Sequence, residues 1–215
     1  MKKLFILCLS MMMLVTPASA DSEKTTNLLI GFTPVLGRMK GSIKYDAKNT
    51  PTDRFQYNKE LGVTIGIERV INGFVVLPEF RYFRGNLKKT EYNSFGAGLP
   101  YPFPYTTFED VNEFGYMQWV GFTINSKKRF QVPIMGGIGL DYVKGAPFNN
   151  MFFDYGLKIR MKLYFTPKFG MFLGGFYEGG SSWSHRGIPK GADSDDKFNL
   201  HKSNLGSEVG FTITL

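Results

Sequence analysis

The stretch FDYGLKIRMKLYF, residues 153–165, decides the fold class because two kinds of side chain alternate along it. Its odd positions are all apolar or aromatic, whereas three of its even positions are the cations Lys158, Arg160 and Lys162. A helix advances about 100° per residue and would scatter these cations among the apolar side chains. In an extended chain successive side chains point to opposite faces, which gives one apolar face and one charged face. The stretch is therefore predicted to be a β-strand.

Two environments suit such a strand. One is a sheet over a soluble core with its charged face in water, and the other is a barrel wall with lipid outside and a polar interior. The same period of two predicts eight strands, at residues 27–36, 60–70, 74–85, 113–125, 129–142, 153–165, 168–178 and 201–215. Pro78 interrupts the third of them and predicts a β-bulge. No apolar run after residue 20 reaches the roughly 18 residues of a spanning helix, so only strands are available to cross a membrane.

The connections between these segments favour the membrane barrel. Short connections at 71–73, 126–128 and 166–168 alternate with long ones at 37–59, 86–112, 143–150 and 179–200. Transmembrane barrels have tight periplasmic turns and longer extracellular loops, with both termini on the periplasmic side. A soluble barrel of the lipocalin type has no reason to separate its loops by length. The predicted fold is therefore all-β, an eight-stranded antiparallel up-and-down transmembrane barrel.

The first 20 residues have the pattern of a secretory signal peptide. Lys2 and Lys3 precede an apolar stretch that ends at the small-residue sequence Ala18-Ser19-Ala20. The predicted organisation is a signal peptide at 1–20 and one barrel domain at 21–215. Cleavage removes Cys8, the only cysteine, which excludes disulfides and thiolate metal sites in the mature chain. It leaves 24 basic residues against 18 acidic ones. Nucleic acid is a poor partner for this surplus, because an exported protein seldom meets any. Contact with anionic lipid headgroups and a generally solvated surface both remain open.

The last strand carries a resemblance to a known family. The sequence GSEVGFTITL, residues 206–215, has alternate apolar side chains up to its end at Leu215. By this segment and by its pattern over residues 27–215, the chain resembles the porin-family, OmpA-like eight-stranded outer-membrane barrels of Gram-negative bacteria. The resemblance implies insertion into the outer membrane by the assembly machinery, which would read the C-terminal strand. It also implies contact with outer-membrane lipids and lipopolysaccharide.

The interior of such a barrel is predicted to hold an ion-pair network. An eight-stranded wall encloses just enough space for side chains, so the lumen is expected to be plugged. Nine charged residues fall on the face opposite lipid: Glu68, Glu79, Arg81, Asp141, Asp154, Lys158, Arg160, Lys162 and Glu208. Charges of both signs in a narrow interior must pair, because an unpaired buried charge is costly. We favour a structural polar core over a gated ion path. Trp119 has two interpretations, a ring at the membrane interface or, by its phase with Glu113, an inward side chain.

Enzymatic and ligand-binding motifs are weak. His201 and Ser203 in HKSN, residues 201–204, resemble the His-x-Ser-Asn motif of lipid A 3-O-deacylases. Such a pair needs a third group, usually an acid, to orient the histidine. Glu208 is the only later acid, and by its parity it lies on the opposite face, so this role is unfilled.

The loop at 95–108 is rich in proline and aromatic residues. We favour a self-packed cap over the barrel mouth for it, and a binding surface for an extracellular ligand is the alternative. The acidic loop at 191–199 lacks the glutamate of a calcium loop, so we favour a solvated loop there. No catalytic, metal or cofactor residues are predicted. The expected function is structural or surface-interacting and non-enzymatic. A small-solute channel and a deacylase-like hydrolase are the alternatives.

Overall fold

The structure is a computed structural model that describes the backbone of residues 24–44, 52–91, 107–125, 129–145, 148–182 and 197–215. Side chains are described at 24–35, 61–86, 111–125, 129–144, 150–182 and 201–215. The predicted signal peptide and the loops at 95–106 and 191–196 lie outside the described residues. Among the described residues no helix has the length and apolarity needed to cross a membrane.

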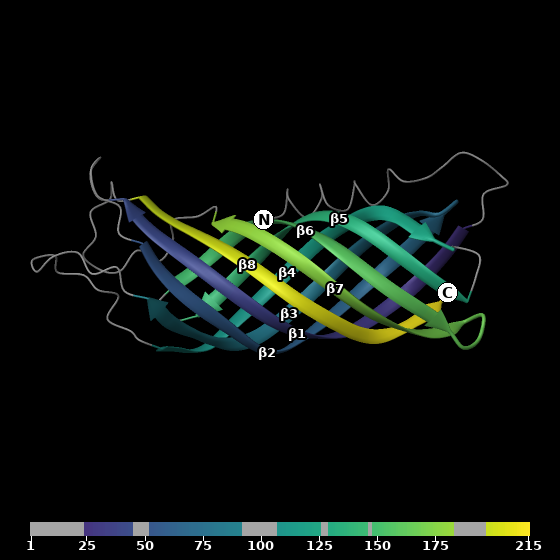
Figure 1. Ribbon diagram of the computed structural model, residues 1–215, viewed down its shortest axis with the longest axis horizontal. Coiled ribbons are helices and arrows are strands. Elements are labelled where there is room, and N and C mark those ends of the chain that lie inside the picture. Colours follow the sequence, from purple (N-terminus) through teal and green to yellow (C-terminus); the bar gives the residue numbers. More distant parts are fainter. Residues whose placement is uncertain (1–23, 45–51, 92–106, 126–128, 146–147, 183–196) are drawn as a thin grey trace, which may run out of the picture.

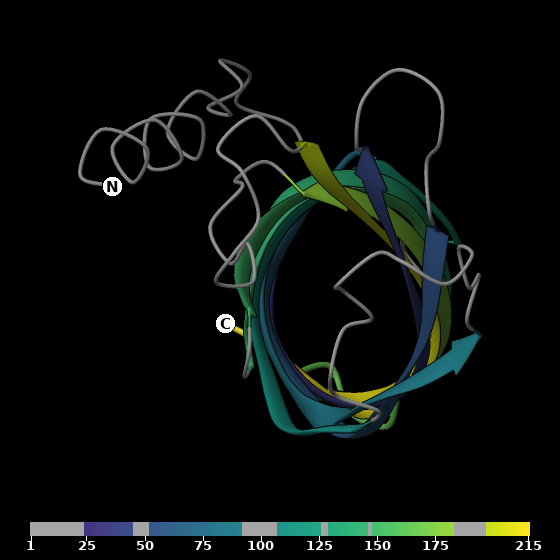
Figure 2. The ribbon, with the colours of Figure 1, turned by 90° about the vertical axis from the view of Figure 1, so that its left-hand side faces the viewer.

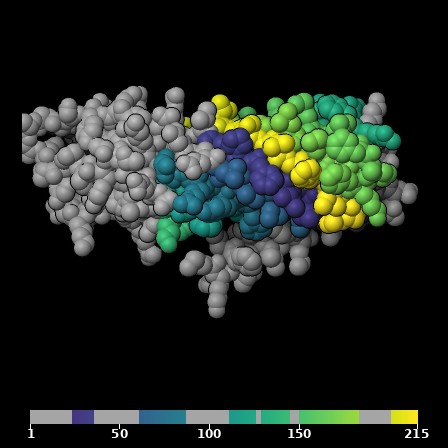
Figure 3. All heavy atoms as spheres, turned by 90° about the horizontal axis from the view of Figure 1, so that it is seen from below, coloured from purple at the N-terminus to yellow at the C-terminus, as the bar shows by residue number. Residues whose placement is uncertain are grey.

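Eight antiparallel strands form a closed barrel, as predicted. The strands are β1 (Lys24–Lys44), β2 (Thr52–Ile71), β3 (Phe74–Glu91), β4 (Thr107–Ile124), β5 (Phe130–Gly145), β6 (Phe148–Tyr164), β7 (Phe169–Ser182) and β8 (Lys197–Thr214). Each strand pairs with its neighbour in sequence, and β1 also pairs with β8, from Asn27 opposite Thr214 to Lys44 opposite Lys197. Figure 1 shows the strands inclined to the long axis, and Figure 2 shows the closed ring seen from one end. In Figure 3, β8 in yellow lies directly against β1 in purple, where the ring closes.

The strands extend further than the hydrophobic pattern indicated. β1 continues to Lys44 and β2 begins at Thr52, so most of the long connection predicted between them is strand. The long connection predicted at 143–150 is wrong, because Gly145 pairs with Phe148 and only residues 146–147 join β5 to β6. The backbone ladder continues through these residues although their sequence no longer alternates cleanly between apolar and polar types.

The bulge predicted at Pro78 is also absent. Pro78 lies opposite Gln118 in an unbroken register between β3 and β4, and the β2–β3 register is the same on both sides of it. A register shift occurs instead in β2 between Lys59 and Leu61, facing the stretch of β1 that contains Pro34. Pro34 has no N–H to give to the ladder, so an irregularity opposite it costs β1 no backbone donor at that position.

Short turns define one end of the barrel, which we call the turn end; the opposite end is the loop end. At the first turn, Asn72 and Gly73 both have positive φ angles, of 51° and 84°, as a two-residue hairpin turn requires. The turn between β6 and β7 is fixed by Thr166, whose hydroxyl oxygen accepts hydrogen bonds from the backbone N–H groups of Lys168 and Phe169. Leu215 donates its backbone N–H to the carbonyl of Thr26, so the last strand also finishes at the turn end.

The outer face of the wall is an exposed apolar band. Every odd residue from Phe153 to Phe165 is exposed, and Leu157 in the middle reaches 66%. Phe122 on β4 is 68% exposed, and aromatic rings contact one another across neighbouring strands, as between Phe74 and Phe122 at 5.5 Å. Such a surface is far too apolar for water and matches the lipid-facing band of a transmembrane barrel.

Candidate functional site in the barrel interior

The interior of the barrel is filled by inward side chains, and its charged residues form two clusters. The turn-side cluster contains Glu68, Glu79, Lys158, Arg160, Lys162 and Glu208. The loop-side cluster contains Arg81, Glu113, Asp141, Asp154, Glu178 and Lys202. All twelve side chains are buried, with at most 4% of any residue exposed.

In the turn-side cluster, Arg160 links carboxylates from two other strands. Its guanidinium contacts Glu79 and Glu208, with a distance of 2.9 Å between Nη2 and Glu208 Oε2. The Nζ atom of Lys158 also contacts both carboxylates and lies 3.3 Å from Glu208 Oε2. A bidentate guanidinium between two carboxylates is among the stronger buried arrangements, because each charge is both neutralised and hydrogen-bonded.

The third cation of β6 has a separate partner. Lys162 pairs with Glu68, and Asn27 donates a hydrogen bond of 2.9 Å from Nδ2 to the same carboxylate. Thr214 in turn donates from Oγ1 to Asn27 Oδ1 at 2.9 Å, which connects β8, β1, β2 and β6 near the turn end. The turn-side cluster therefore has three cations and three carboxylates and is electrically balanced.

The loop-side cluster has two cations and four carboxyl groups. Arg81 donates from Nε to Asp141 Oδ1 at 3.0 Å, lies 2.9 Å from Asp154 Oδ2 through Nη2, and contacts Glu178. Lys202 contacts Asp141 and lies 3.0 Å from Glu113 Oε1 and 2.9 Å from Asp154 Oδ2. Asp141 and Asp154 are thus shared by both cations, and removal of either cation would leave the carboxyl groups strongly unbalanced.

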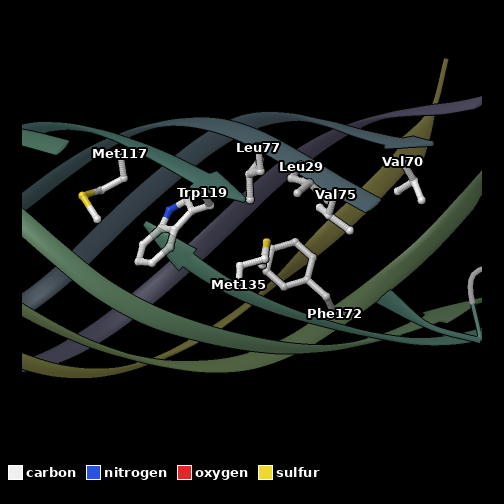
Figure 4. Packing of buried hydrophobic residues seen from close by; sticks show 8 residues of the cluster. All are labelled: Leu29, Val70, Val75, Leu77, Met117, Trp119, Met135 and Phe172. Atoms are coloured by element: carbon white, nitrogen blue, oxygen red, sulfur yellow. The ribbon is translucent and has the colours of Figure 1, made fainter. Parts of the chain in front are cut away.

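Apolar side chains fill the space around the charges. Figure 4 shows a cluster of Leu29, Val70, Val75, Leu77, Met117, Trp119, Met135 and Phe172 pointing into the barrel. Of the two interpretations of Trp119, the structure shows the inward side chain. Its Nε1 donates a hydrogen bond of 3.2 Å to Glu79 Oε1, and Lys158 Nζ lies 4.6 Å from its ring centre. The guanidinium carbon of Arg160 lies 4.7 Å from the ring centre of Phe172. Lys158 and Arg160 therefore each lie close to an aromatic ring as well as to carboxylates.

The structure places all nine predicted network residues in the interior and in contact with an opposite charge. The prediction missed Asn27, Glu178 and Lys202, and it noted the inward phase of Glu113 without assigning it a partner. Lys202 lies an even number of residues before Glu208 in the last strand, so the alternation could have predicted that it also points inward. Glu178 lies in the glycine-rich β7, where few side chains mark the two faces.

His201 and Ser203, the pair considered for the deacylase-like alternative, lie on the outer face. His201 is exposed and Ser203 is half-buried, and the Nδ1 atom of His201 lies 2.9 Å from the Oγ atom of Ser181, across the β7–β8 ladder. Glu208 points into the barrel, where Arg160 and Lys158 hold it, so it does not orient His201. His185 lies outside the described residues.

No group of three or more histidine, cysteine, aspartate or glutamate side chains in the described part of the chain is arranged to hold a metal ion. The four carboxyl groups of the loop-side cluster are directed at Arg81 and Lys202 instead.

Comparison with known proteins supports the fold. No protein-family model matches the sequence, and no curated protein matches it. The outer membrane protein OprG from Pseudomonas aeruginosa is similar in structure, with a TM-score of 0.54 and 10% identity over 90% of this chain and 97% of that chain. The outer membrane protein AlkL, solved in DMPC lipid bilayers, has a TM-score of 0.51 and 12% identity over 93% of this chain and 94% of that chain. The chain has the fold of the eight-stranded outer-membrane β-barrel proteins.

Proposed function

We propose that the protein is an integral outer-membrane barrel with a plugged lumen, which acts as a non-enzymatic structural or surface-interaction protein. The barrel would anchor the chain in the outer membrane after export through the signal peptide. The segments that join the strands at the loop end would provide any recognition of an extracellular ligand. Outer-membrane lipids and lipopolysaccharide would surround the wall, and the assembly machinery would bind the C-terminal strand during insertion.

The observation that carries this proposal is the connection of opposite walls through the lumen. Arg160 on β6 contacts Glu79 on β3 and Glu208 on β8, so the turn-side cluster crosses the interior rather than lining it. Opening an axial path would separate these groups, and breaking a buried pair on one side costs about 3–5 kcal/mol. Thermal motion rarely supplies that energy, which favours a closed lumen.

Electrical recording of the folded mature chain tests the plugged lumen. The protein is refolded in detergent, its compact form is verified by faster migration of the unboiled sample on a gel, and it is then added to a planar bilayer. A compact band without steady conductance is the expected result. Steady conductance comparable to that of a general porin would refute the plugged lumen and support the small-solute channel. Absence of a compact band would put the membrane barrel itself in question.

A hydrolysis assay tests the non-enzymatic part of the proposal. The folded protein is incubated with lipopolysaccharide and with phospholipid, and released fatty acid is measured. The expected release equals that of the His201→Ala variant, because His201 has no carboxylate on its face of the described wall to hold it as a base. Release that His201→Ala and Ser203→Ala both abolish would support the deacylase-like alternative.

A further inference from the structure

The charged side chains of the described wall are sorted by sign between its two faces. All seven described carboxylates, namely Glu68, Glu79, Glu113, Asp141, Asp154, Glu178 and Glu208, are buried in the interior. The described charged residues outside the interior are six cations, Lys24, Arg69, Arg84, Arg129, Lys144 and Lys168. The described outer surface therefore carries positive side-chain charge only.

Four of these cations, Lys24, Arg69, Arg129 and Lys168, lie at the turn end, and we call them the cationic rim. Lys24 begins β1, and Arg69 lies two residues before the end of β2. Arg129 directly precedes β5, and Lys168 lies in the turn between β6 and β7. Because the strands follow one another around the barrel in sequence order, the rim is distributed around the circumference rather than gathered on one side.

The backbone holds the rim residues in place. The carbonyl of Arg129 accepts a hydrogen bond of 2.9 Å from the N–H of Tyr164, and the carbonyl of Lys168 accepts one of 2.8 Å from the N–H of Thr214. Both cations are therefore attached to the strand ladder, although their side chains are exposed. A fixed backbone keeps the base of each of these exposed basic side chains at a constant depth along the barrel axis, and the flexible stem lets the charge reach the surrounding medium.

Aromatic rings lie beside the rim. The ring centres of Phe165 and Phe169 are 6.4 Å apart, and those of Phe169 and Phe211 are 5.8 Å apart. On the other side of the barrel, Phe74 and Phe122 form a similar contact. Rings that end an apolar band mark the boundary between hydrocarbon and headgroups, so the adjoining cations lie at headgroup depth.

We propose that the cationic rim binds the anionic headgroups of phospholipids in the leaflet at the turn end. This inference rests on the proposed membrane location. A lipid leaflet surrounds the barrel and reaches all four cations at once, whereas a single protein partner would touch only one side of the rim. A basic residue near an anionic surface gains enough attraction to enrich an anionic lipid beside it roughly fivefold.

Electron paramagnetic resonance of spin-labelled lipids tests the proposal. The full mature chain is reconstituted in phosphatidylcholine vesicles, and the association of labelled phosphatidylglycerol is compared with that of labelled phosphatidylcholine. Wild-type protein is expected to prefer phosphatidylglycerol at low salt. The preference should fall toward one in 1 M salt, where the Debye length is about 3 Å.

The variants assign the effect to the rim. The triple variant Lys24→Gln, Arg129→Gln, Lys168→Gln should lose most of the preference, whereas Lys24→Arg, Arg129→Lys, Lys168→Arg should retain it. Lys144→Gln, which removes an outward cation at the loop end, should lose much less than the glutamine triple variant. A preference that is unchanged in that triple variant, or insensitive to salt, would overturn the rim proposal. Unboiled gels of the same vesicles distinguish failure of the rim proposal from failure of the proposed membrane location. A protein that does not insert gives no compact band, and that result contradicts the proposed function, not the rim proposal.

Discussion

Replacing Arg160 with methionine removes the guanidinium that links Glu79 and Glu208 across the lumen. Methionine keeps an unbranched stem against Phe172 but donates no hydrogen bond. The two carboxylates then share the single ammonium of Lys158, which lies 3.3 Å from Glu208 Oε2. Removal of one partner from a buried ion pair typically costs 3–5 kcal/mol, so we expect the free energy of unfolding to fall by about 4 kcal/mol.

Urea titration in lipid vesicles measures this loss through the disappearance of the compact unboiled band. With a slope of roughly 2 kcal/mol per M urea, the expected loss moves the unfolding midpoint down by about 2 M. The double variant Arg160→Met, Glu208→Gln should recover at least about 1 kcal/mol, because the uncompensated carboxylate becomes a neutral amide. Lys144→Met removes an exposed cation and serves as the matched control, with an expected change within about 0.5 kcal/mol.

A loss below about 1 kcal/mol for Arg160→Met would refute the reasoning. That value is typical of a solvated surface pair, so the carboxylates would have to be hydrated in place of Arg160. The lumen would then contain water, and the conductance measurement would need to be repeated on this variant.

Three other substitutions test separate parts of the structure. Gly115→Ala should cost about 1–3 kcal/mol, because the new methyl carbon would lie 1.8 Å from Asp141 Oδ1. Gly136→Ala is the control and should cost nothing, because the nearest atom to its methyl carbon would be 3.9 Å away. Urea titration measures both. Leu157→Arg should cost roughly 2–4 kcal/mol in vesicles, well above Leu157→Ala, and equal costs would contradict a lipid-facing position. Trp119→Phe should cost about 1–2 kcal/mol through the lost indole hydrogen bond to a buried carboxylate, and an unchanged midpoint would contradict that bond.

The strand period allowed the fold class and the inward face to be predicted, because period two is a local property of the chain. Applied to charged residues, the same alternation predicted nine inward members of the network, including Lys158, Arg160 and Lys162 in residues 153–165. It failed for Glu178, since the surrounding glycines of β7 have no side chains to define a face. It also missed Lys202, which lies before the apolar part of the last strand begins.

The partners within the network were beyond sequence reasoning. Which carboxylate meets Arg160 depends on how far each strand is shifted along its neighbour and on where the ring closes. The strand lengths at the loop end were also hidden, because the ladder there continues through residues such as Gly145, Asn149 and Asn150, whose types are typical of turns. The two-residue connection after Gly145 is the clearest example.

The ion pairs of the lumen join residues that are far apart along the chain. Arg81 and Glu178 are separated by 97 positions, Lys162 and Glu68 by 94, and Lys202 and Glu113 by 89. An open sheet of the first few strands would hold Glu68 and Glu79 without the cations of β6, and would have to keep them in water. The charges can therefore be buried with their partners only when all eight strands are in place. Insertion of a partly closed barrel would be unfavourable, because it would bury unpaired charges. Closure of the β1–β8 seam is thus coupled to entry into the bilayer.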